Sequence, residues 1–287
     1  MRLDNFCCPV CKKPLAVTTA KLCCAPCERD FAIVDDIPDL FVGDVEQDFV
    51  DDPNRTWLDP RIVEARDTVY RLCSRELKGM IFCMQEIGRR VRAGCRILEV
   101  GMGTGHFTRW LAKVSEPGTE IYAFDFSWPI IEKAKANTQG LSGITLFRAN
   151  ARRSLPFADT SFDIVLVRLA PLGARGIPNV QAGFELLKPG GWYFQAGWKP
   201  EQYETPPTEW AIQHGYKDAE HHVWQYRRMQ TEQEYAAMQI EQERLASMGC
   251  KSVEETLETN VGNPQGKDRS ILKMTHENLL IAQKPVQ

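Results

Sequence analysis

Short apolar runs alternate with amphipathic stretches along most of this chain of 287 residues. Helical spacing of apolar residues is found over 62–92, 106–114, 128–140 and 180–188. Between these stretches, apolar runs that are typical of buried strands occupy 95–101, 120–127, 144–150, 162–170 and 191–198. Because strands that alternate with helices form βαβ units, the pattern predicts an α/β protein with a mainly parallel, doubly wound, Rossmann-like sheet.

Both ends of the chain depart from this alternation. Residues 1–42 are rich in cysteine and contain, at 31–42, a pattern typical of a strand, a turn and an extended segment. Residues 43–60 form an acidic linker, and 61–287 make up the large domain. Within that domain, 199–247 is predicted to be a polar, aromatic-rich helical insertion. A final strand pair is predicted at 253–261 and 277–285.

Charge is distributed unevenly. The net charge is −3 and the isoelectric point about 6.0, which argues against a strongly basic nucleic-acid-binding surface. Residues 35–60, however, hold nine acids and one base, so the rest of the chain is mildly basic and the low isoelectric point is a weak argument against RNA. The N-terminus lacks the apolar run of a signal peptide, and no stretch approaches membrane-spanning length. We therefore expect a cytoplasmic protein with no membrane partner.

Six of the ten cysteines stand in two short copies, CCPVC at 7–11 and CCAPC at 23–27. Cytoplasmic disulfides are unusual, so clustered cysteines indicate metal or redox chemistry. Two C-x2-C pairs separated by twelve residues are typical of a structural zinc site, with the ligands Cys8, Cys11, Cys24 and Cys27. The looser pairs Cys7/Cys11 and Cys23/Cys27 remain the alternative. If the ribbon is independent, removing the metal should unfold 1–42 and leave the rest almost intact.

A glycine-rich loop follows the first predicted strand in ILEVGMGTGHF, with Gly101, Gly103 and Gly105. Glycine permits a close backbone approach to a ligand, and the N-terminus of the next helix presents free N–H groups. Dinucleotide sites need a third glycine three positions after the second, where this chain has His106. The spacing therefore disfavours NAD.

The loop and three further motifs resemble those of class I S-adenosylmethionine-dependent methyltransferases. The motifs are ILEVGMGTG, FDFSWPIIEKAKAN, RANARRSLPFADTSFDIVLV and ELLKPGGW, in that order. The resemblance implies a seven-stranded sheet and S-adenosylmethionine as cofactor. It assigns the methionine part to Glu99 and the three glycines, the ribose to Asp125, and the adenine to Phe126, Asn150 and Ala151. It also places Arg168 and Leu169 beside the reacting sulfur. Asn150 is a departure, because the family usually has aspartate there; an amide oxygen can still accept from an amine.

The methyl acceptor is less well defined by the sequence. The 199–247 insertion falls where such sites open, and we expect it to cover a small-molecule acceptor, with His221 or His222 as a base and Arg168 nearby. In the alternative, its aromatic residues pack on the sheet edge and the histidines face solvent. His221 and His222 lack the ligand spacing of a metal site.

A second resemblance bears on the same question. The N-terminal cysteines with VRLAPLG and LLKPGGW resemble the 23S rRNA guanine-N1 methyltransferases, although CPVCKKPL is more similar to small zinc-ribbon activators of methyltransferases. An RNA methyltransferase whose ribbon contacts RNA is therefore the alternative to a small-molecule enzyme. Its RNA-contacting residues would be Arg2, Lys12, Lys13, Lys21 and Arg29. A non-catalytic, cofactor-binding scaffold is the third reading, disfavoured by the intact glycine loop.

Overall fold

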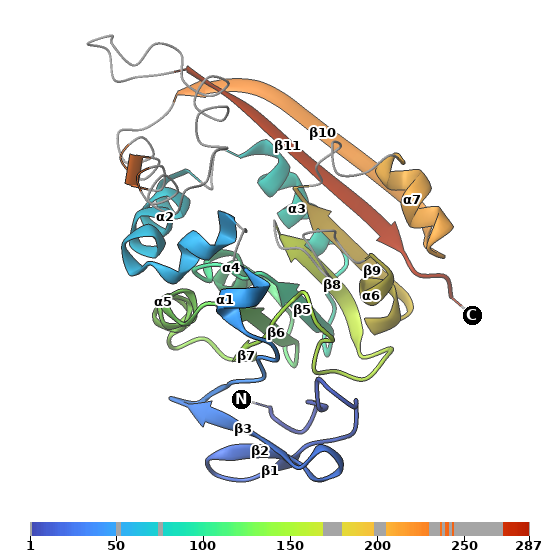
Figure 1. Ribbon diagram of the computed structural model, residues 1–287. Helices are drawn as coiled ribbons and strands as arrows, with labels where there is room; N and C mark the ends of the chain where they lie inside the picture. Colours follow the sequence, from blue (N-terminus) through green and yellow to red (C-terminus); the bar gives the residue numbers. More distant parts are fainter. Residues whose placement is uncertain are drawn as a thin grey trace.

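Two β-sheets organise the protein (Figure 1). The computed structural model describes residues 2–49, 53–73, 77–168, 180–197, 205–229 and 272–286, with a few isolated positions between 236 and 243. The small sheet contains, in order, β1 (Ala16–Val17), β2 (Lys21–Cys24), β3 (Arg29–Val34) and β4 (Ile37–Pro38). A short 3₁₀ turn, η1 (Ala25–Cys27), joins β2 to β3.

The large sheet has seven strands in the order β10-β11-β9-β8-β5-β6-β7. The strands are β5 (Arg96–Val100), β6 (Glu120–Asp125), β7 (Ile144–Arg148), β8 (Phe162–Arg168), β9 (Leu187–Ala196), β10 (Lys217–Met229) and β11 (Leu272–Gln283). Strands β5 to β9 are parallel, and β11 pairs antiparallel with both β9 and β10. The predicted doubly wound, Rossmann-like sheet of seven strands is thus confirmed.

Helices α3, α4 and α5 cover one face of the large sheet. Their apolar side chains pack with Ile97, Ile121 and Ile164 in one buried cluster. The helical elements are α1 (Val45–Asp48), η2 (Pro53–Leu58), α2 (Pro60–Cys73), α3 (Lys78–Gly88), α4 (His106–Val114), α5 (Trp128–Thr138), α6 (Val180–Leu186) and α7 (Pro207–Gln213). None of the helices in the described ranges is long and apolar enough to cross a membrane.

The small sheet covers part of the opposite face, together with α6 and α7. Phe6 packs edge-on against Tyr122 and Phe147 of the large sheet, with ring centroids 5.8 and 5.1 Å apart. Residues 149–161, which connect the parallel strands β7 and β8, contain turns and no helix, although such crossovers usually supply one. A parallel sheet needs both faces covered. The N-terminal segment therefore fills the place of the missing helix.

Polar contacts fasten the N-terminal segment at the same place. The Lys12 ammonium donates to the backbone carbonyl of Leu155 at 2.5 Å, and Leu40 N–H donates to the carbonyl of Arg148 at 2.9 Å. Asp39 pairs with the Arg148 guanidinium at 3.0 Å. Because the two sheets share one apolar cluster, the expectation that 1–42 unfolds alone on metal removal is revised.

The predicted helical insertion is wrong over residues 217–229, which form the long edge strand β10. His222 and Trp224 both pack against Phe82 of α3, whereas Val223 between them is 58% exposed. This period of two is that of a strand with one face covered. β10 is also the outer partner of β11, the strand predicted at 277–285, while the strand predicted at 253–261 lies outside the described residues.

One smaller boundary also differs from the sequence-based expectation. The helical pattern of 62–92 is divided into α2 and α3. The N–H groups of Gly79 and Met80, at the start of α3, donate to the Glu277 carboxylate at 3.0 and 3.2 Å. Glu277 lies on β11, so the beginning of α3 is stabilised by a residue almost two hundred positions away, which no local pattern reveals.

Candidate cofactor and metal sites

The glycine-rich loop lies between the end of β5 and the start of α4. Gly101, Gly103 and Gly105 all have positive φ angles, of 71°, 55° and 80°. A Cβ on Gly105 would lie 3.0 Å from Ala134 of α5, whereas a Cβ on Gly103 would meet nothing within 4 Å. The loop is therefore packed closely beneath Gly105 and open above Gly103, as a cradle for a ligand requires.

Glu99 precedes this loop and is completely buried. One carboxylate oxygen accepts from the Thr108 hydroxyl at 2.6 Å. The other has no hydrogen-bond donor among the described residues, and the Arg168 guanidinium stands 3.7 Å from it. Burial raises the pKa of Glu99 to about 7, opposed by Arg168 and by the Thr108 hydroxyl. A buried acceptor with one unsatisfied oxygen is suited to a ligand that brings a cationic donor.

Asp125 ends β6, the strand beside β5. Its carboxylate accepts from the backbone N–H of Phe126 at 2.8 Å and of Gly103 at 3.2 Å. These two bonds tie the glycine loop to the neighbouring strand. Burial raises the pKa of Asp125 to about 6, although the backbone donors oppose the shift. The two carboxylates thus stand at adjoining carboxyl ends of the sheet, where open α/β sheets bind ligands.

Phe126 and Asn150 extend the same edge toward β7. The Phe126 ring stacks on Phe49 with centroids 4.2 Å apart and an interplanar angle of 12°. The Asn150 side chain is buried, and its amide donates to an Asp48 carboxylate oxygen at 2.8 Å. Ala151 follows at the turn and packs against the apolar cluster. The structure brings these predicted residues together, with residues of the acidic linker lying against them.

Arg168 ends β8, and its guanidinium lies 4.6 Å above the Phe107 ring. With the Glu99 contact, this places Arg168 beside the glycine loop, where the sequence predicts it. Leu169 lies outside the described residues.

His221 and His222 lie on β10, four strands from β5, a separation of about 19 Å at ordinary strand spacing. The imidazole of His222 contacts Glu220 at 3.1 Å, while burial lowers the pKa of His221. Neither ring is therefore brought to the glycine loop, and a catalytic role for them stays a prediction.

One polar cluster beside the loop escaped the sequence analysis. His106, the first residue of α4, contacts Asp67 of α2 at 2.8 Å, and the Asn137 amide donates to the same carboxylate oxygen at 2.7 Å. Asn137 also donates to the carbonyl of Thr104 in the loop at 2.8 Å. The position of His106 in the loop motif was the one sequence feature that could have indicated this cluster. The sequence around Asp67 and Asn137 contains no motif that indicates it. The cluster fixes the loop to α2 and α5.

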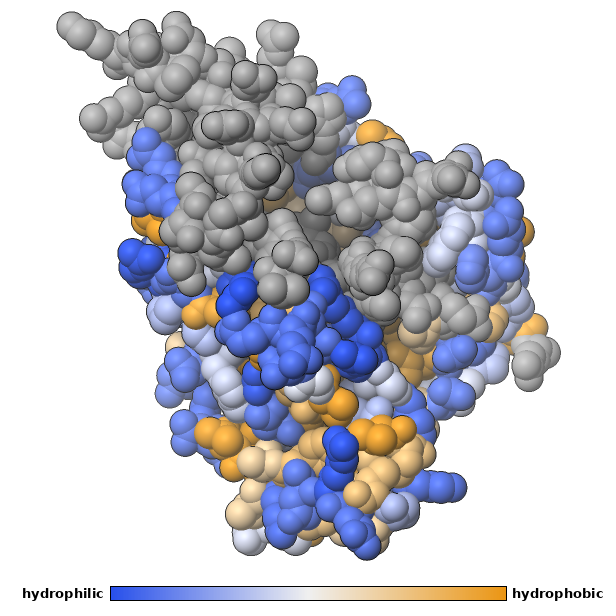
Figure 2. Space-filling view, viewed as in Figure 1, coloured by the Kyte–Doolittle hydropathy of each residue, from blue (hydrophilic) through white to orange (hydrophobic). Residues whose placement is uncertain are grey.

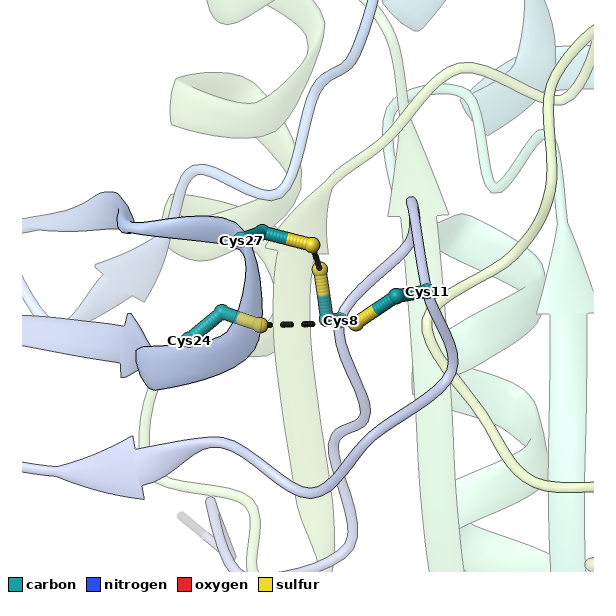
Figure 3. Close-up of side chains that lie close together, drawn as sticks. All are labelled: Cys8, Cys11, Cys24 and Cys27. Carbon is teal, nitrogen blue, oxygen red and sulfur yellow. Dashed lines mark hydrogen bonds between the residues drawn. The ribbon is translucent and has the colours of Figure 1, made fainter.

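The four predicted metal ligands meet at one point between the first turn of the chain and η1 (Figure 3). The sulfurs of Cys8, Cys11, Cys24 and Cys27 all lie within 4.8 Å of one another. The Cys11–Cys24 and Cys8–Cys27 sulfur distances are 3.5 and 3.9 Å. Four sulfurs at about 2.3 Å from a tetrahedral zinc are about 3.8 Å apart. The geometry fits the C-x2-C pairs, and Cys7 and Cys23 are not members of the cluster.

Backbone donors support thiolates in this cluster. The N–H of Val10 points to the Cys8 sulfur at 3.4 Å. The pKa of Cys11 is lowered to about 7, first by the backbone N–H of Lys13 and then by hydrogen bonding with Cys27. In the metal-free cluster, hydrogen bonding with Cys11 raises the pKa of Cys27 to about 12, and burial raises that of Cys24. Since thiolates and not thiols are metal ligands, the donor set suits zinc.

Known proteins with related sequences cover the centre of the chain. Residues 97–191 match the family described as "Methyltransferase domain". A demethylmenaquinone methyltransferase of Staphylococcus aureus is 35% identical over 112 residues, which are 38% of this chain and 44% of that protein. The chain thus aligns with less than half the length of this curated relative, and the same holds for its counterparts in other strains.

Solved structures resemble a larger part of the chain than the related sequences do. The YcgJ protein of Bacillus subtilis covers 72% of this chain and 100% of its own, with a TM-score of 0.52 and 18% identity. Phosphoethanolamine N-methyltransferase 2 of Haemonchus contortus, in complex with phosphomonomethylethanolamine and S-adenosylhomocysteine, covers 82% of this chain and 60% of its own. Its TM-score is 0.52 and its identity 17%. The chain therefore shares the fold of these two structures, and its residues 97–191 are similar to methyltransferase domains.

Proposed function

We propose that this protein is an S-adenosylmethionine-dependent methyltransferase that acts on a small organic molecule. The observation that carries the proposal is the arrangement of Glu99, the glycine loop and Asp125 along adjoining strand ends. It combines an open cradle above Gly103 with a buried Glu99 oxygen that has no hydrogen-bond donor among the described residues. These carboxylate acceptors fit the ammonium and ribose hydroxyl donors of that cofactor.

The residues divide the work of holding the cofactor. Glu99 faces the cationic amine, the glycine loop allows close approach of the backbone, and Asp125 accepts from ribose hydroxyls. Phe126, Asn150 and Ala151 border the adenine end, and Arg168 borders the opposite end of the site. When bound, S-adenosylmethionine supplies an electrophilic methyl group on a sulfonium. The protein contributes chiefly by orienting the acceptor and excluding water.

A small acceptor is favoured over RNA by charge. Asp44, Glu46 and Asp48 gather around α1, Asp48 lies against Asn150 at the strand ends, and Glu46 and Asp48 already pair with Arg55 and Arg153. This segment therefore offers a nucleic-acid backbone no excess of positive charge. Two of the related proteins described above are a demethylmenaquinone methyltransferase and a phosphoethanolamine methyltransferase, and each is named after a small molecule. A small-molecule acceptor is consistent with the charge and with these names.

The experiment that tests this function uses cofactor with a labelled methyl group. The full-length protein is incubated with labelled S-adenosylmethionine and a cell extract divided into small-molecule, protein and RNA fractions. Label is expected in the small-molecule fraction, and the Asp125→Ala variant should leave that fraction unlabelled. Label in the RNA fraction would contradict the proposed acceptor class, and label in no fraction would contradict the activity.

We further propose that Cys8, Cys11, Cys24 and Cys27 hold a structural zinc ion. All four ligand positions come from the protein, so the site is closed and leaves no position for substrate. Its role is to hold together the N-terminal segment, which is too small to build a core of its own.

Cofactor affinity is expected to depend on pH. The raised pKa values of Glu99 (about 7) and Asp125 (about 6) mean that both are partly protonated near pH 6 in the ligand-free protein. Only the ionised forms pair with an amine or accept from both ribose hydroxyls. Affinity measured by calorimetry should therefore rise from pH 5.5 to pH 8. The Glu99→Gln variant should bind the cofactor weakly. Its affinity should no longer change with pH near 7, because the group that titrates there is missing.

The stability of the ligand-free protein should change in the opposite direction. A carboxyl whose folded pKa lies above its unfolded pKa holds its proton more tightly in the folded state. Stability is then greatest below the unfolded value and falls as pH rises through about 7. An affinity that does not vary between pH 5.5 and pH 8 would contradict the assignment of the two carboxylates.

A further inference from the structure

Residues 42–49 of the acidic linker lie across the carboxyl ends of β6 and β7, and we call this segment the strap. Its short helix α1 begins at Asp44, whose carboxylate accepts from the N–H groups of Glu46 and Gln47 at 2.8 and 3.2 Å. Figure 2 shows strongly hydrophilic residues gathered over α1 on this face of the molecule. Although it is acidic and hydrophilic, the strap places its last side chain, Phe49, inside the protein: Phe49 is only 4% exposed.

Phe49 lies between an aromatic ring and a cation. One side faces Phe126 in a stacked arrangement at 4.2 Å, and the guanidinium of Arg152 lies 4.5 Å from its ring centroid. Phe126 directly follows Asp125, so a ligand that extends from the glycine loop across Asp125 reaches this ring next. Two rings stacked at 4.2 Å leave no room for a third between them, since each aromatic layer needs about 3.5 Å. Phe49 therefore covers one face of Phe126, on which a flat ligand group could otherwise stack.

Asp48 engages the second residue at this end of the site. It accepts from the Asn150 amide at 2.8 Å and from the Arg153 guanidinium at 2.5 Å. The Asn150 amide also donates to the carbonyl of Val42, at 3.2 Å. The donors of Asn150 that face this end of the site are thus satisfied by the strap itself.

Close packing shows that the strap fits this position specifically. Gly43 has a φ of +118°, and a Cβ there would lie 2.1 Å from an Asp48 carboxylate oxygen and 3.2 Å from the Asn150 amide nitrogen. A side chain at residue 43 would prevent Asp48 from reaching Asn150. The backbone of Trp57, beyond the strap, is held in turn by the Ser127 hydroxyl at 2.5 Å.

We propose that the strap is an internal competitor of the cofactor, in which Phe49 occupies the adenine position and must leave before S-adenosylmethionine binds fully. This inference rests on the function proposed above. Apparent affinity is then reduced by the fraction of molecules in which the strap is closed. The strap also keeps the apolar face of Phe126 covered until the cofactor arrives.

Hydrogen exchange followed by mass spectrometry tests the movement of the strap directly. On addition of S-adenosylhomocysteine, peptides that cover 101–105 should exchange more slowly, because the loop contacts the ligand. Peptides that cover 46–49 should exchange faster, because the amides of Asp48 and Phe49 lose their helical partners. Slower exchange at both places would show that the strap closes over the ligand, and would overturn the proposal.

Calorimetry of variants supplies a second test. Phe49→Ala should bind S-adenosylhomocysteine more tightly, by up to about tenfold, since a stacked aromatic pair is lost only from the closed state. Asp48→Asn, which keeps the shape of the side chain but loses its charge, should change affinity in the same direction. The control is Phe82→Ala, which removes a ring packed on the other edge of the sheet and should leave affinity unchanged.

The outcomes separate this proposal from the one on which it rests. Weaker or unchanged binding by Phe49→Ala, with wild-type binding that depends on Asp125, would overturn the strap as a competitor and keep the cofactor site. Binding by neither the wild type nor Phe49→Ala would contradict the cofactor assignment, and the strap proposal would fall with it.

Discussion

Asp125→Ala is expected to abolish measurable binding of S-adenosylhomocysteine. The substitution removes the acceptor proposed for two ribose hydroxyls, and hydrogen bonds to a charged group are worth about 1.5–3 kcal/mol each. It also leaves the N–H of Gly103 without its acceptor across the loop. Together these losses correspond to an affinity reduced by a factor of about 100 or more. Isothermal titration calorimetry of the purified full-length protein measures this effect.

A matched control is Asp159→Ala. Asp159 is an exposed turn residue between β7 and β8, so its loss should leave affinity within about twofold of the wild type. Thermal unfolding of both variants checks that each is folded. Unchanged affinity of Asp125→Ala would show that the glycine loop and its partner strand do not form the cofactor site.

If Cys8, Cys11, Cys24 and Cys27 hold zinc as proposed, its removal is expected to unfold the large sheet as well as the N-terminal segment. Apparent binding free energies of structural zinc reach about 10–16 kcal/mol in small zinc domains, comparable to the whole stability of a typical domain. Here the metal-binding segment also covers Tyr122 and Phe147 of the large sheet. A chelator should therefore lower the melting temperature in one cooperative transition, measured by circular dichroism, and cofactor binding should be lost in parallel.

The doubled cysteines provide a stringent control for the same prediction. Cys24→Ser removes a buried ligand, whereas Cys23→Ser changes the neighbouring residue, whose sulfur is outside the cluster. Only the first should reproduce the effect of the chelator, and elemental analysis should find zinc retained in the second. A cofactor affinity that survives complete metal removal would show that the large sheet does not depend on the N-terminal segment.

The central part of the fold was predictable because its strands are continuous apolar runs. β5, β6 and β8 are buried on both faces, so each contains a continuous apolar run, and their charged residues stand at or near the strand ends. β10 was mistaken for a helix because its outer position leaves one face polar and inserts charged residues and two histidines. At an edge strand, packing against α3 and not composition decides the structure.

The candidate site was predictable where a local motif carries it. Glu99 and Asp125 lie at the ends of recognisable strands and the glycines follow one. Spacing favours the two C-x2-C pairs, and the structure distinguishes them from the looser alternative. The strap was not predictable, because acidic composition indicates a solvated linker and gives no sign that Phe49 returns to Phe126. Likewise, the contact between Asn5 and Tyr122, at 2.5 Å, joins residues 117 positions apart. Such pairings depend on topology, which local patterns do not encode.

The N-terminal cover on the large sheet has a consequence for how the chain reaches its native state. Phe6 and Lys12 leave the ribosome before their partners Phe147 and Leu155, which lie more than a hundred positions later in the chain. Contacts of such high sequence separation slow folding. A nascent chain that binds its metal early has a folded N-terminal segment, whose apolar surface is ready to pack against β6 and β7. Without metal, the same face of the sheet would stay uncovered, and such chains are prone to aggregation. If the four cysteines hold zinc as proposed, zinc supply during synthesis is expected to limit the yield of folded protein.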